Sequence, residues 1–197
     1  MARTKHTVYV TNGCSNHSDK ERVKDDFYAT PPVATEWLLR VEPDLCAKIW
    51  EPCCGMGHIS EVLRDNGKWV HSTDLVPRGY GLGEPLDFLQ CNGEWTGDIV
   101  TNPPYNLAQE FVEKAMELVT DGHKVCMLLK LTFMEGAKRE SLFAKYPPKH
   151  IHVFSRRINC WPNGEEPKIS SAVCYAWFVW EKGYTGDTVI KRIENKN

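Results

Sequence analysis

The sequence predicts an α/β fold in which helices cover both faces of a mostly parallel sheet, and two observations lead to this prediction. Segments with the composition of strands alternate with segments of helical periodicity along most of the chain. Several of the expected strands also end in polar or glycine-rich residues, as strands do where the carboxyl edge of such a sheet binds a ligand. No internal repeat or low-complexity tract interrupts the alternation.

The size and composition of the chain predict a single folded domain. Its 197 residues are 42% hydrophobic and 25% charged, which is ordinary for a soluble globular protein. No apolar run approaches the roughly 20 residues of a membrane span, and the amino terminus lacks the apolar core of a signal peptide. We expect a cytoplasmic protein with a loose polar arm at 1–24, a folded domain at 25–183 and a tail at 184–197.

The first elements follow a double proline at 31–32, which is suited to a helix start. The next residues, VATEWLLRV, predict a helix of about ten residues, and its inner face is expected to carry Val33, Trp37, Leu38 and Val41. Residues 48–67 read as a short strand, a loop with glycines and a helix that Gly67 ends. The residues expected on the inner face of that second helix are Ile59, Val62 and Leu63.

Six further segments have the composition of strands, and with the first strand they make seven. Helical periodicity is found at 107–119, and more weakly at 134–146. No helical pattern separates the last two strands, so we expect them to be antiparallel at one edge of the sheet. The six segments are 68–75, 85–91, 97–105, 123–131, 150–158 and 170–183.

The cysteines and the charges give weaker indications. None of the eight cysteines forms a CxxC pair, and only Cys53 and Cys54 are close neighbours, so reduced core thiols are favoured over disulfides or zinc. Residues 1–129 carry 12 Lys and Arg against 19 Asp and Glu, whereas residues 130–197 carry 12 against 7. The basic part could meet phosphates while the acidic part holds a small cofactor, although a solvated charged surface explains the asymmetry equally well.

Polar residues at three strand ends predict a cofactor pocket. Gly55 and Gly57 follow the first strand, where glycine allows the backbone to approach a ligand closely. Asp74 lies about 20 residues further on, at the end of the second strand, where a carboxylate can accept both hydroxyl hydrogens of a ribose. Asp87 could accept from an adenine amino group while Phe88 packs on the ring, although a turn at the end of a strand explains both residues nearly as well.

The segment Asn102-Pro103-Pro104-Tyr105 follows the fourth strand and predicts chemistry on a planar amine. The lone pair of an exocyclic amine is delocalised into its ring, so the amine is a poor nucleophile. Acceptors such as the Asn102 amide oxygen and the Pro103 carbonyl can draw that nitrogen toward a tetrahedral geometry and free its lone pair for attack on a methyl group. Prolines fix this backbone, and Tyr105 offers a face for stacking. The alternative is a rigid turn, which the neighbouring motifs disfavour.

These motifs together resemble those of the amino-methyltransferases, most closely the small bacterial and phage-type adenine-specific DNA methyltransferases. The matching segments are DFYATPP (26–32), EPCCGMG (51–57), STDL (72–75), DF (87–88) and TNPPY (101–105), within a resemblance that spans residues 24–181. It implies a Rossmann-like class I methyltransferase fold with seven strands, the last of them antiparallel. It also implies S-adenosylmethionine as cofactor and transfer of a methyl group to the N6 amine of adenine in DNA.

The resemblance also implies roles for individual residues. The methionine part of the cofactor would touch Tyr28, Thr30 and Pro31. The cofactor loop would consist of Glu51, Pro52, Cys53, Gly55 and Gly57. Asp74 and Leu75 would hold the ribose, Asp87 and Phe88 would border the adenine ring, and Asn102 would lie between the cofactor and the target base held by residues 102–105. Cys53 and Cys54 depart from the pattern, because an acidic or small residue is more usual there.

The resemblance further implies a second aromatic clamp on the flipped base, and Trp161 is its candidate, with plain packing as the alternative. Arg156, Arg157 and Lys168 could contact phosphates, although exposed basic residues are common. Only 44 residues separate Gly57 from Asn102. We therefore expect no recognition domain, so that a target sequence would be read by the arm, by 132–149, by 155–170, by a second subunit or not at all.

Two other functions remain open at this point. The same chemistry suits adenine in RNA or the side-chain amide of a protein glutamine, because each presents a planar NH₂ group. A subunit of a methyltransferase complex that binds cofactor without turnover would keep the fold, although the intact loop at 51–57 and the NPPY segment argue against it. DNA is the expected partner, and no metal is expected at the site.

Overall fold

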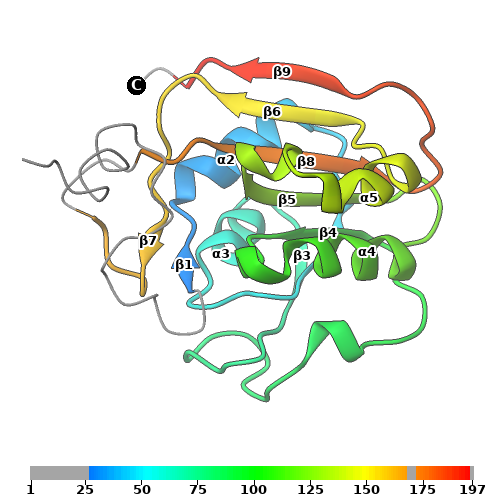
Figure 1. The fold of residues 1–197 in the computed structure, drawn as a ribbon. Helices are drawn as coiled ribbons and strands as arrows, with labels where there is room; N and C mark the ends of the chain where they lie inside the picture. Colours follow the sequence, from blue (N-terminus) through cyan, green and yellow to red (C-terminus); the bar gives the residue numbers. More distant parts are fainter. Residues whose placement is uncertain (1–26, 168–171, 196–197) are drawn as a thin grey trace, which may run out of the picture.

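The computed structural model describes residues 27–167 and 172–195 (Figure 1). The predicted arm at 1–24 and Lys168 lie outside these residues. Among the described residues, no helix is long and apolar enough to cross a membrane.

A seven-stranded sheet forms the centre of the molecule, with the strand order β3-β2-β4-β5-β8-β6-β9 (Figure 1). All neighbouring strands are parallel except β8, which runs antiparallel to β5 and to β6. The prediction of a mostly parallel sheet with an antiparallel strand near the carboxyl terminus is therefore confirmed. The strands are β2 (Lys48–Glu51), β3 (Trp69–Ser72), β4 (Asp98–Thr101), β5 (Lys124–Lys130), β6 (His150–Phe154), β8 (Tyr175–Glu181) and β9 (Val189–Ile193).

Helices cover both faces of the sheet and bury a separate apolar cluster on each. On one face, α4 contributes Phe111 and α5 contributes Leu142; on the other, α2 contributes Leu38 and α3 contributes Leu63. The two layers are visible in Figure 1. The helices are α2 (Pro32–Val41), α3 (His58–Asp65), α4 (Ala108–Leu118) and α5 (Glu140–Lys145), with 3₁₀ turns η2 (Phe88–Gln90), η3 (Tyr105–Leu107), η4 (Leu131–Met134) and η5 (Ala137–Arg139).

The prediction of a strand at 85–91 is wrong, because this segment forms the 3₁₀ turn η2. The Asp87 side chain accepts a hydrogen bond from the Leu89 amide (3.0 Å), and the Asp87 backbone carbonyl accepts one from the Gln90 amide (3.0 Å). This local bonding by an aspartate competes with strand pairing. An isolated bridge between Asp74 and Pro85 is the only ladder contact recorded for the segment.

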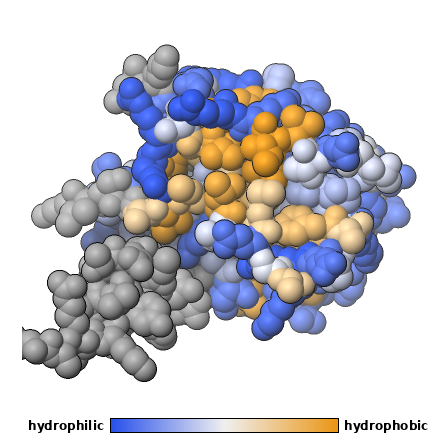
Figure 2. All heavy atoms as spheres, turned by 45° about the horizontal axis from the view of Figure 1, so that its top comes forward, coloured by the Kyte–Doolittle hydropathy of each residue, from blue (hydrophilic) through white to orange (hydrophobic). Residues whose placement is uncertain are grey.

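The seventh strand is β9, within the segment 184–197 that the sequence predicted as a tail. It pairs in parallel with β6 and forms an edge of the sheet. Four of its five residues are exposed, so its sequence shows no apolar alternation that could have revealed a strand. Figure 2 turns the top of Figure 1, where β9 lies, toward the viewer. The face then seen has apolar residues gathered in its middle and hydrophilic residues around them.

The inner face of α2 agrees with the predicted one at Trp37, Leu38 and Val41 but not at Val33, and that of α3 agrees with its prediction. In α2 the buried residues are Ala34, Thr35 and Leu38, and Val33 is 42% exposed. One cause is Trp177 on β8, whose indole N–H donates to the Ala34 carbonyl (2.8 Å) and fixes which side of the helix meets the sheet. Of the three residues predicted for the inner face of α3, Ile59 and Leu63 are buried and Val62 is half-buried.

A second sheet consists of only two strands, β1 (Tyr28–Ala29) and β7 (Trp161–Pro162), which pair antiparallel. It joins the segment that precedes α2 to the loop that follows β6, at the left of Figure 1. Strands of two residues carry no periodicity, so the sequence did not predict this contact. All seven described cysteines are free thiols, as predicted, although Cys174 is exposed rather than part of the core.

Candidate active site

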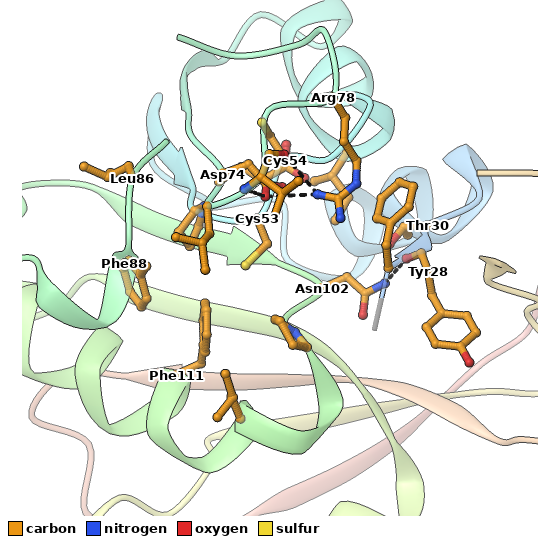
Figure 3. Close-up of a pocket in the computed structure, with 18 of the residues that line it drawn as sticks. Tyr28, Thr30, Cys53, Cys54, Asp74, Arg78, Leu86, Phe88, Asn102 and Phe111 are labelled. Atoms are coloured by element: carbon orange, nitrogen blue, oxygen red, sulfur yellow. Dashed lines mark hydrogen bonds and ion pairs between the residues drawn. The ribbon is translucent and has the colours of Figure 1, made fainter. Parts of the chain in front are cut away.

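A cavity of about 590 Å³ opens at the carboxyl ends of β2, β3 and β4 (Figure 3). It lies where the strand order reverses, because β3 and β4 flank β2 on opposite sides, and α/β sheets bind ligands at such a point. Its volume is in the range of small-molecule sites. The predicted residues that line it are Tyr28, Thr30, Glu51, Pro52, Cys53, Asp74, Leu75, Asp87, Phe88, Asn102 and Pro104.

The Asn102 side chain is oriented by the backbone of β1. Its amide nitrogen donates a hydrogen bond to the Tyr28 carbonyl (2.8 Å), shown as a dashed line in Figure 3. The Asn102 Oδ1 atom is buried and accepts no hydrogen bond from any described residue. The Thr30 hydroxyl, on the same cavity wall, is also buried without a partner among the described residues. Buried polar atoms are rarely left in this state, so both atoms are ready to bond with a ligand.

Tyr105 packs beside this cavity and does not line it. Its ring lies 5.7 Å from the ring of Tyr28 and 5.9 Å from that of Tyr175, and the Lys130 ammonium lies 4.6 Å from the ring centre. Burial raises the pKa of the Tyr105 hydroxyl well above its ordinary value, so the phenol stays neutral. Of the two prolines, Pro104 lines the cavity and Pro103 is buried.

Close packing explains the two glycines of the loop after β2. Gly55 has φ +51° and Gly57 has φ +90°, a left-handed conformation that favours glycine. A Cβ at Gly55 would lie 2.5 Å from the Phe27 ring, and a Cβ at Gly57 would lie 2.5 Å from the Tyr80 ring. Neither glycine lines the cavity, so the space that the missing side chains leave is occupied by Phe27 and Tyr80.

Asp74 holds the loop after β2 in place. One carboxylate oxygen accepts from the Gly55 amide (2.7 Å), and the other accepts from the Val76 amide (2.8 Å) and pairs with Arg78 (3.2 Å). The Arg78 guanidinium in turn lies 4.3 Å from the centre of the Phe27 ring. Both Asp74 and Arg78 line the cavity (Figure 3). The carboxylate therefore faces the cavity while it fixes the surrounding backbone.

Glu51, at the end of β2, is a buried acid that also lines the cavity. The Ser60 hydroxyl donates to its carboxylate, and Ser60 and Ser72 share a hydrogen bond of 2.6 Å. Burial raises the pKa of Glu51 to about 8, because the charged form loses its hydration. Near neutral pH the side chain is thus mostly protonated.

The raised pKa of Glu51 predicts a pH-dependent stability. Folding raises it from 4.5 to about 8, so the contribution of Glu51 is fully present below pH 4.5 and is lost as pH rises through about 8. The shift corresponds to roughly 4–5 kcal/mol. Glu51→Gln is neutral at every pH and should lack this loss. Between about pH 5 and about pH 9, the free energy of unfolding measured in urea should therefore fall by on the order of 4 kcal/mol more for the wild type than for the variant.

A control and a contrary result follow for Glu51. Glu110 is an exposed acid of α4, and Glu110→Gln should shift stability equally at both pH values. If the free energies of unfolding of Glu51→Gln and the wild type differed by the same amount at both pH values, Glu51 would be ionised in the folded protein over this whole range.

The other end of the cavity is apolar. Phe88 is buried, 5.2 Å from the Trp50 ring and 5.1 Å from the Phe111 ring, and it lines the cavity with Leu86 and Leu89. Its ring is therefore both part of the core and part of the cavity wall. Asp87 is exposed, and one of its carboxylate oxygens already accepts from the Leu89 amide. A flat apolar ligand fits this end.

Outside the NPPY segment, the described residues predicted to contact substrate do not line the cavity. Trp161 belongs to β7 and its ring lies 5.3 Å from that of His58, which does line the cavity. Arg156 and Arg157 line a separate groove. Pro31 ends the segment before α2 and does not line the cavity. Sequence reasoning missed several lining residues; Phe27, Ala29 and Cys54 stood within recognised motifs, and the others give no signal. They are Phe27, Ala29, Cys54, His58, Ile59, Val76, Arg78, Leu86, Leu89, Asn106, Leu107 and Phe111.

Comparison of the sequence with models of known protein families and with curated proteins found no match. Solved structures do match. A candidate RNA methyltransferase of Pyrococcus horikoshii has a TM-score of 0.61 at 14% identity, over 91% of this chain and 99% of that one. A candidate class I S-adenosylmethionine-dependent methyltransferase of Listeria monocytogenes has a TM-score of 0.60 at 12% identity, over 95% and 71%.

A predicted O-methyltransferase of Agrobacterium tumefaciens has a TM-score of 0.60 at 12% identity, over 82% of this chain and 85% of that one. The first and third descriptions name different acceptors, the second names none, and the identities of all three to this chain are low. The likeness therefore concerns the arrangement of strands and helices. The chain has the fold of the class I methyltransferases.

Proposed function

We propose that this protein is an S-adenosylmethionine-dependent methyltransferase that methylates the exocyclic N6 amine of adenine in DNA. The observation that carries the proposal is the Asn102 amide, whose nitrogen is held by the Tyr28 carbonyl at 2.8 Å while its buried oxygen lacks a hydrogen bond within the described residues. An acceptor fixed in this way suits an NH₂ donor. The DNA and adenine parts of the proposal rest on the resemblance of the motifs.

The chemistry follows from this acceptor. A hydrogen bond from the amine to Asn102 Oδ1, and a second one to the Pro103 carbonyl, would favour a tetrahedral nitrogen with a free lone pair. That lone pair would face the methyl group that a bound cofactor would supply, and the proton released from the amine on transfer would pass to water. The protein's part is to hold the amine in line and to exclude water from the attack.

The cavity fits S-adenosylmethionine in charge and polarity. The cofactor is a sulfonium cation, and the acids Asp74 and Asp87 line the cavity together with the largely neutral Glu51. The unpartnered Thr30 hydroxyl and Asn102 oxygen lie toward one end of this lining, and the apolar wall around Phe88 lies at the other. Thr30 and the loop at 51–57 would then hold the methionine part, Asp74 the ribose, and Phe88 the adenine ring. The cofactor supplies the electrophilic methyl group.

Asp74→Asn should weaken cofactor binding. The substitution removes the charge that the Gly55 amide, the Val76 amide and Arg78 share, and it removes a ribose acceptor. Hydrogen bonds to a charged group contribute roughly 1.5–3 kcal/mol, so we expect affinity to fall by about ten- to hundredfold. Calorimetric titration with S-adenosylhomocysteine measures the change. Asp65→Asn, an exposed acid at the end of α3, is the matched control, and unchanged affinity in Asp74→Asn would exclude this role.

The proposal is tested by finding the acceptor. The protein is incubated with methyl-labelled cofactor and, separately, with unmethylated duplex DNA, RNA transcripts and cell extract, and the methylated nucleoside or amino acid is identified after digestion. N6-methyladenine in DNA is the expected product. Label in RNA or protein alone would refute the DNA assignment, and cofactor binding without any transfer would favour a non-catalytic subunit.

RNA adenine is the second candidate acceptor. The structure described as a candidate RNA methyltransferase matches 91% of this chain and 99% of its own. The planar NH₂ of adenine is the same in both polymers, so the Asn102 acceptor does not distinguish them. The 2′-hydroxyl of RNA does, which makes a pair of oligonucleotides of equal sequence the discriminating substrates.

A further inference from the structure

A second groove, of about 460 Å³, lies between α2 and the loop that follows β6. One wall is the outer face of α2 and the other is the loop that follows β6. We call it the arginine groove, because three guanidinium groups line it. Its lining residues are Val33, Glu36, Trp37, Arg40, Arg156, Arg157, Ile158 and Asn195.

The loop wall of the arginine groove is held by hydrogen bonds from the carboxyl-terminal segment. The buried Asn195 accepts from the Arg156 amide (2.8 Å) and from the Ser155 hydroxyl (3.0 Å), and it donates to the Arg156 carbonyl (3.2 Å). The Arg157 guanidinium donates to the Ala172 carbonyl (2.6 Å). The backbone of Arg156 and the guanidinium of Arg157 are thus held before any ligand arrives, which reduces the entropy cost of binding.

The charges in this groove are unbalanced. Arg40, Arg156 and Arg157 face a single carboxylate, Glu36, and within 27–167 and 172–195 no ion pair is recorded for Arg40 or Arg156. Arg40 stacks on the Trp37 ring at 4.7 Å. Guanidinium groups bind phosphate oxygens in a bidentate manner, and an arginine laid on an aromatic ring presents its N–H edge outward.

Both walls of the arginine groove adjoin residues that lie at or beside the active-site cavity. The α2 wall begins directly after Thr30 and Pro31, and Thr30 lines the cavity. The loop wall includes Ile158, and Ile158 and Cys160 belong to the buried apolar cluster against which Tyr105 packs. A polymer whose target base enters at Asn102 would therefore pass this groove with its neighbouring nucleotides.

We propose that the arginine groove binds the phosphodiester backbone of the nucleic-acid substrate beside the target nucleotide. The proposal rests on the proposed function, since it assumes a nucleic-acid acceptor. Arg40 and Arg156 contact successive phosphates, Arg157 adds charge from the loop, and Trp37 offers the edge of its ring to a sugar or base. The groove thus supplies affinity along the strand, whereas Asn102 selects the amine.

The test compares Arg40→Gln/Arg156→Gln/Arg157→Gln with the wild type. Binding of labelled single-stranded DNA and RNA oligonucleotides of equal sequence is followed by fluorescence anisotropy over a range of salt concentrations, with S-adenosylhomocysteine present. Each phosphate contact contributes about 0.7 to the slope of log K against log salt. The triple variant should lose at least tenfold in affinity and about 2 in slope. Its affinity for S-adenosylhomocysteine should stay unchanged, which also shows that it is folded.

The matched control is Lys114→Gln/Lys145→Gln/Lys149→Gln, which removes three positive charges from α4, from α5 and from the residue before β6. It should keep most of the affinity and of the slope. Equal losses of oligonucleotide affinity in both variants, or no loss in either, would refute phosphate binding by the arginine groove. Methyl transfer with an unchanged KM in the arginine variant would refute it as well. A wild type that binds oligonucleotide through the three arginines but transfers no methyl group to it would instead contradict the proposed function alone.

Discussion

Asn102→Ala should lower methyl transfer by about 10²–10³ in kcat, which is the loss seen when one preorganised polar group is removed from an active site. The variant lacks the buried oxygen that has no hydrogen-bond partner in the described residues, so the amine would keep its delocalised lone pair. Affinity for S-adenosylhomocysteine should change by less than about threefold, because the main cofactor contacts proposed here lie in other residues. Single-turnover transfer of labelled methyl groups measures kcat, and calorimetry measures the affinity.

Asn106→Ala is the matched control for Asn102. Asn106 carries the same amide and lines the same cavity, but it is exposed and follows the NPPY segment. Its loss should reduce kcat by less than about tenfold, as is usual for an exposed polar contact. Full activity in Asn102→Ala would refute the mechanism proposed here, and a large loss of cofactor affinity would mean that Asn102 serves mainly to bind the cofactor.

The strand-end residues could be predicted because two kinds of signal coincide in them. Buried strands such as β2 and β4 are short apolar runs, so the point where each ends is visible in the sequence, and parallel strands bring their carboxyl ends to one edge. Glu51, Asp74 and Asn102 follow such runs, and the structure places all three around one cavity.

The remaining features depend on contacts that leave no periodic signal. The exposed β9 (VIKRI) shows no regular alternation and was predicted as a tail, whereas 85–91 was predicted as a strand but is turned by the Asp87 side chain. Gly55 and Gly57 were interpreted as room for a ligand, and their Cβ space is occupied by Phe27 and Tyr80. Each of these outcomes is decided by residues distant in the sequence or by one local hydrogen bond, and neither follows from composition.

A buried charge network near the amino ends of the strands, opposite the cavity, was likewise not predicted. The Glu42 carboxylate, at the end of α2, is 2% exposed and accepts from Lys124 Nζ (2.7 Å), His150 Nδ1 (2.5 Å) and His152 Nε2 (2.7 Å). Burial alone would raise its pKa, but the hydrogen bonds from His152, Lys124 and His150 hold it at about 2. Lys124 also pairs with the exposed Asp44 (2.6 Å). The network joins α2, β5 and β6 through one carboxylate.

Glu42→Ala should destabilise the fold by about 3–5 kcal/mol, because it leaves the buried Lys124 ammonium with only an exposed partner. The lowered pKa gives a stability contribution that is present above pH 4.5 and lost as pH falls through about 2. Urea unfolding should therefore show the variant and the wild type converging as the pH is lowered below about 4.

The double variant Glu42→Gln/Lys124→Met separates charge from packing. Removing both buried charges should recover much of the stability lost in Glu42→Ala, since a buried ion pair contributes little once its desolvation is counted. Methyl transfer per folded molecule should match the wild type in the double variant, because Glu42 and Lys124 lie at the amino ends of the strands and the cavity lies at their carboxyl ends. A double variant as unstable as Glu42→Ala would show that the negative charge of Glu42 beside the two histidines, rather than its pairing with Lys124, makes Glu42 necessary.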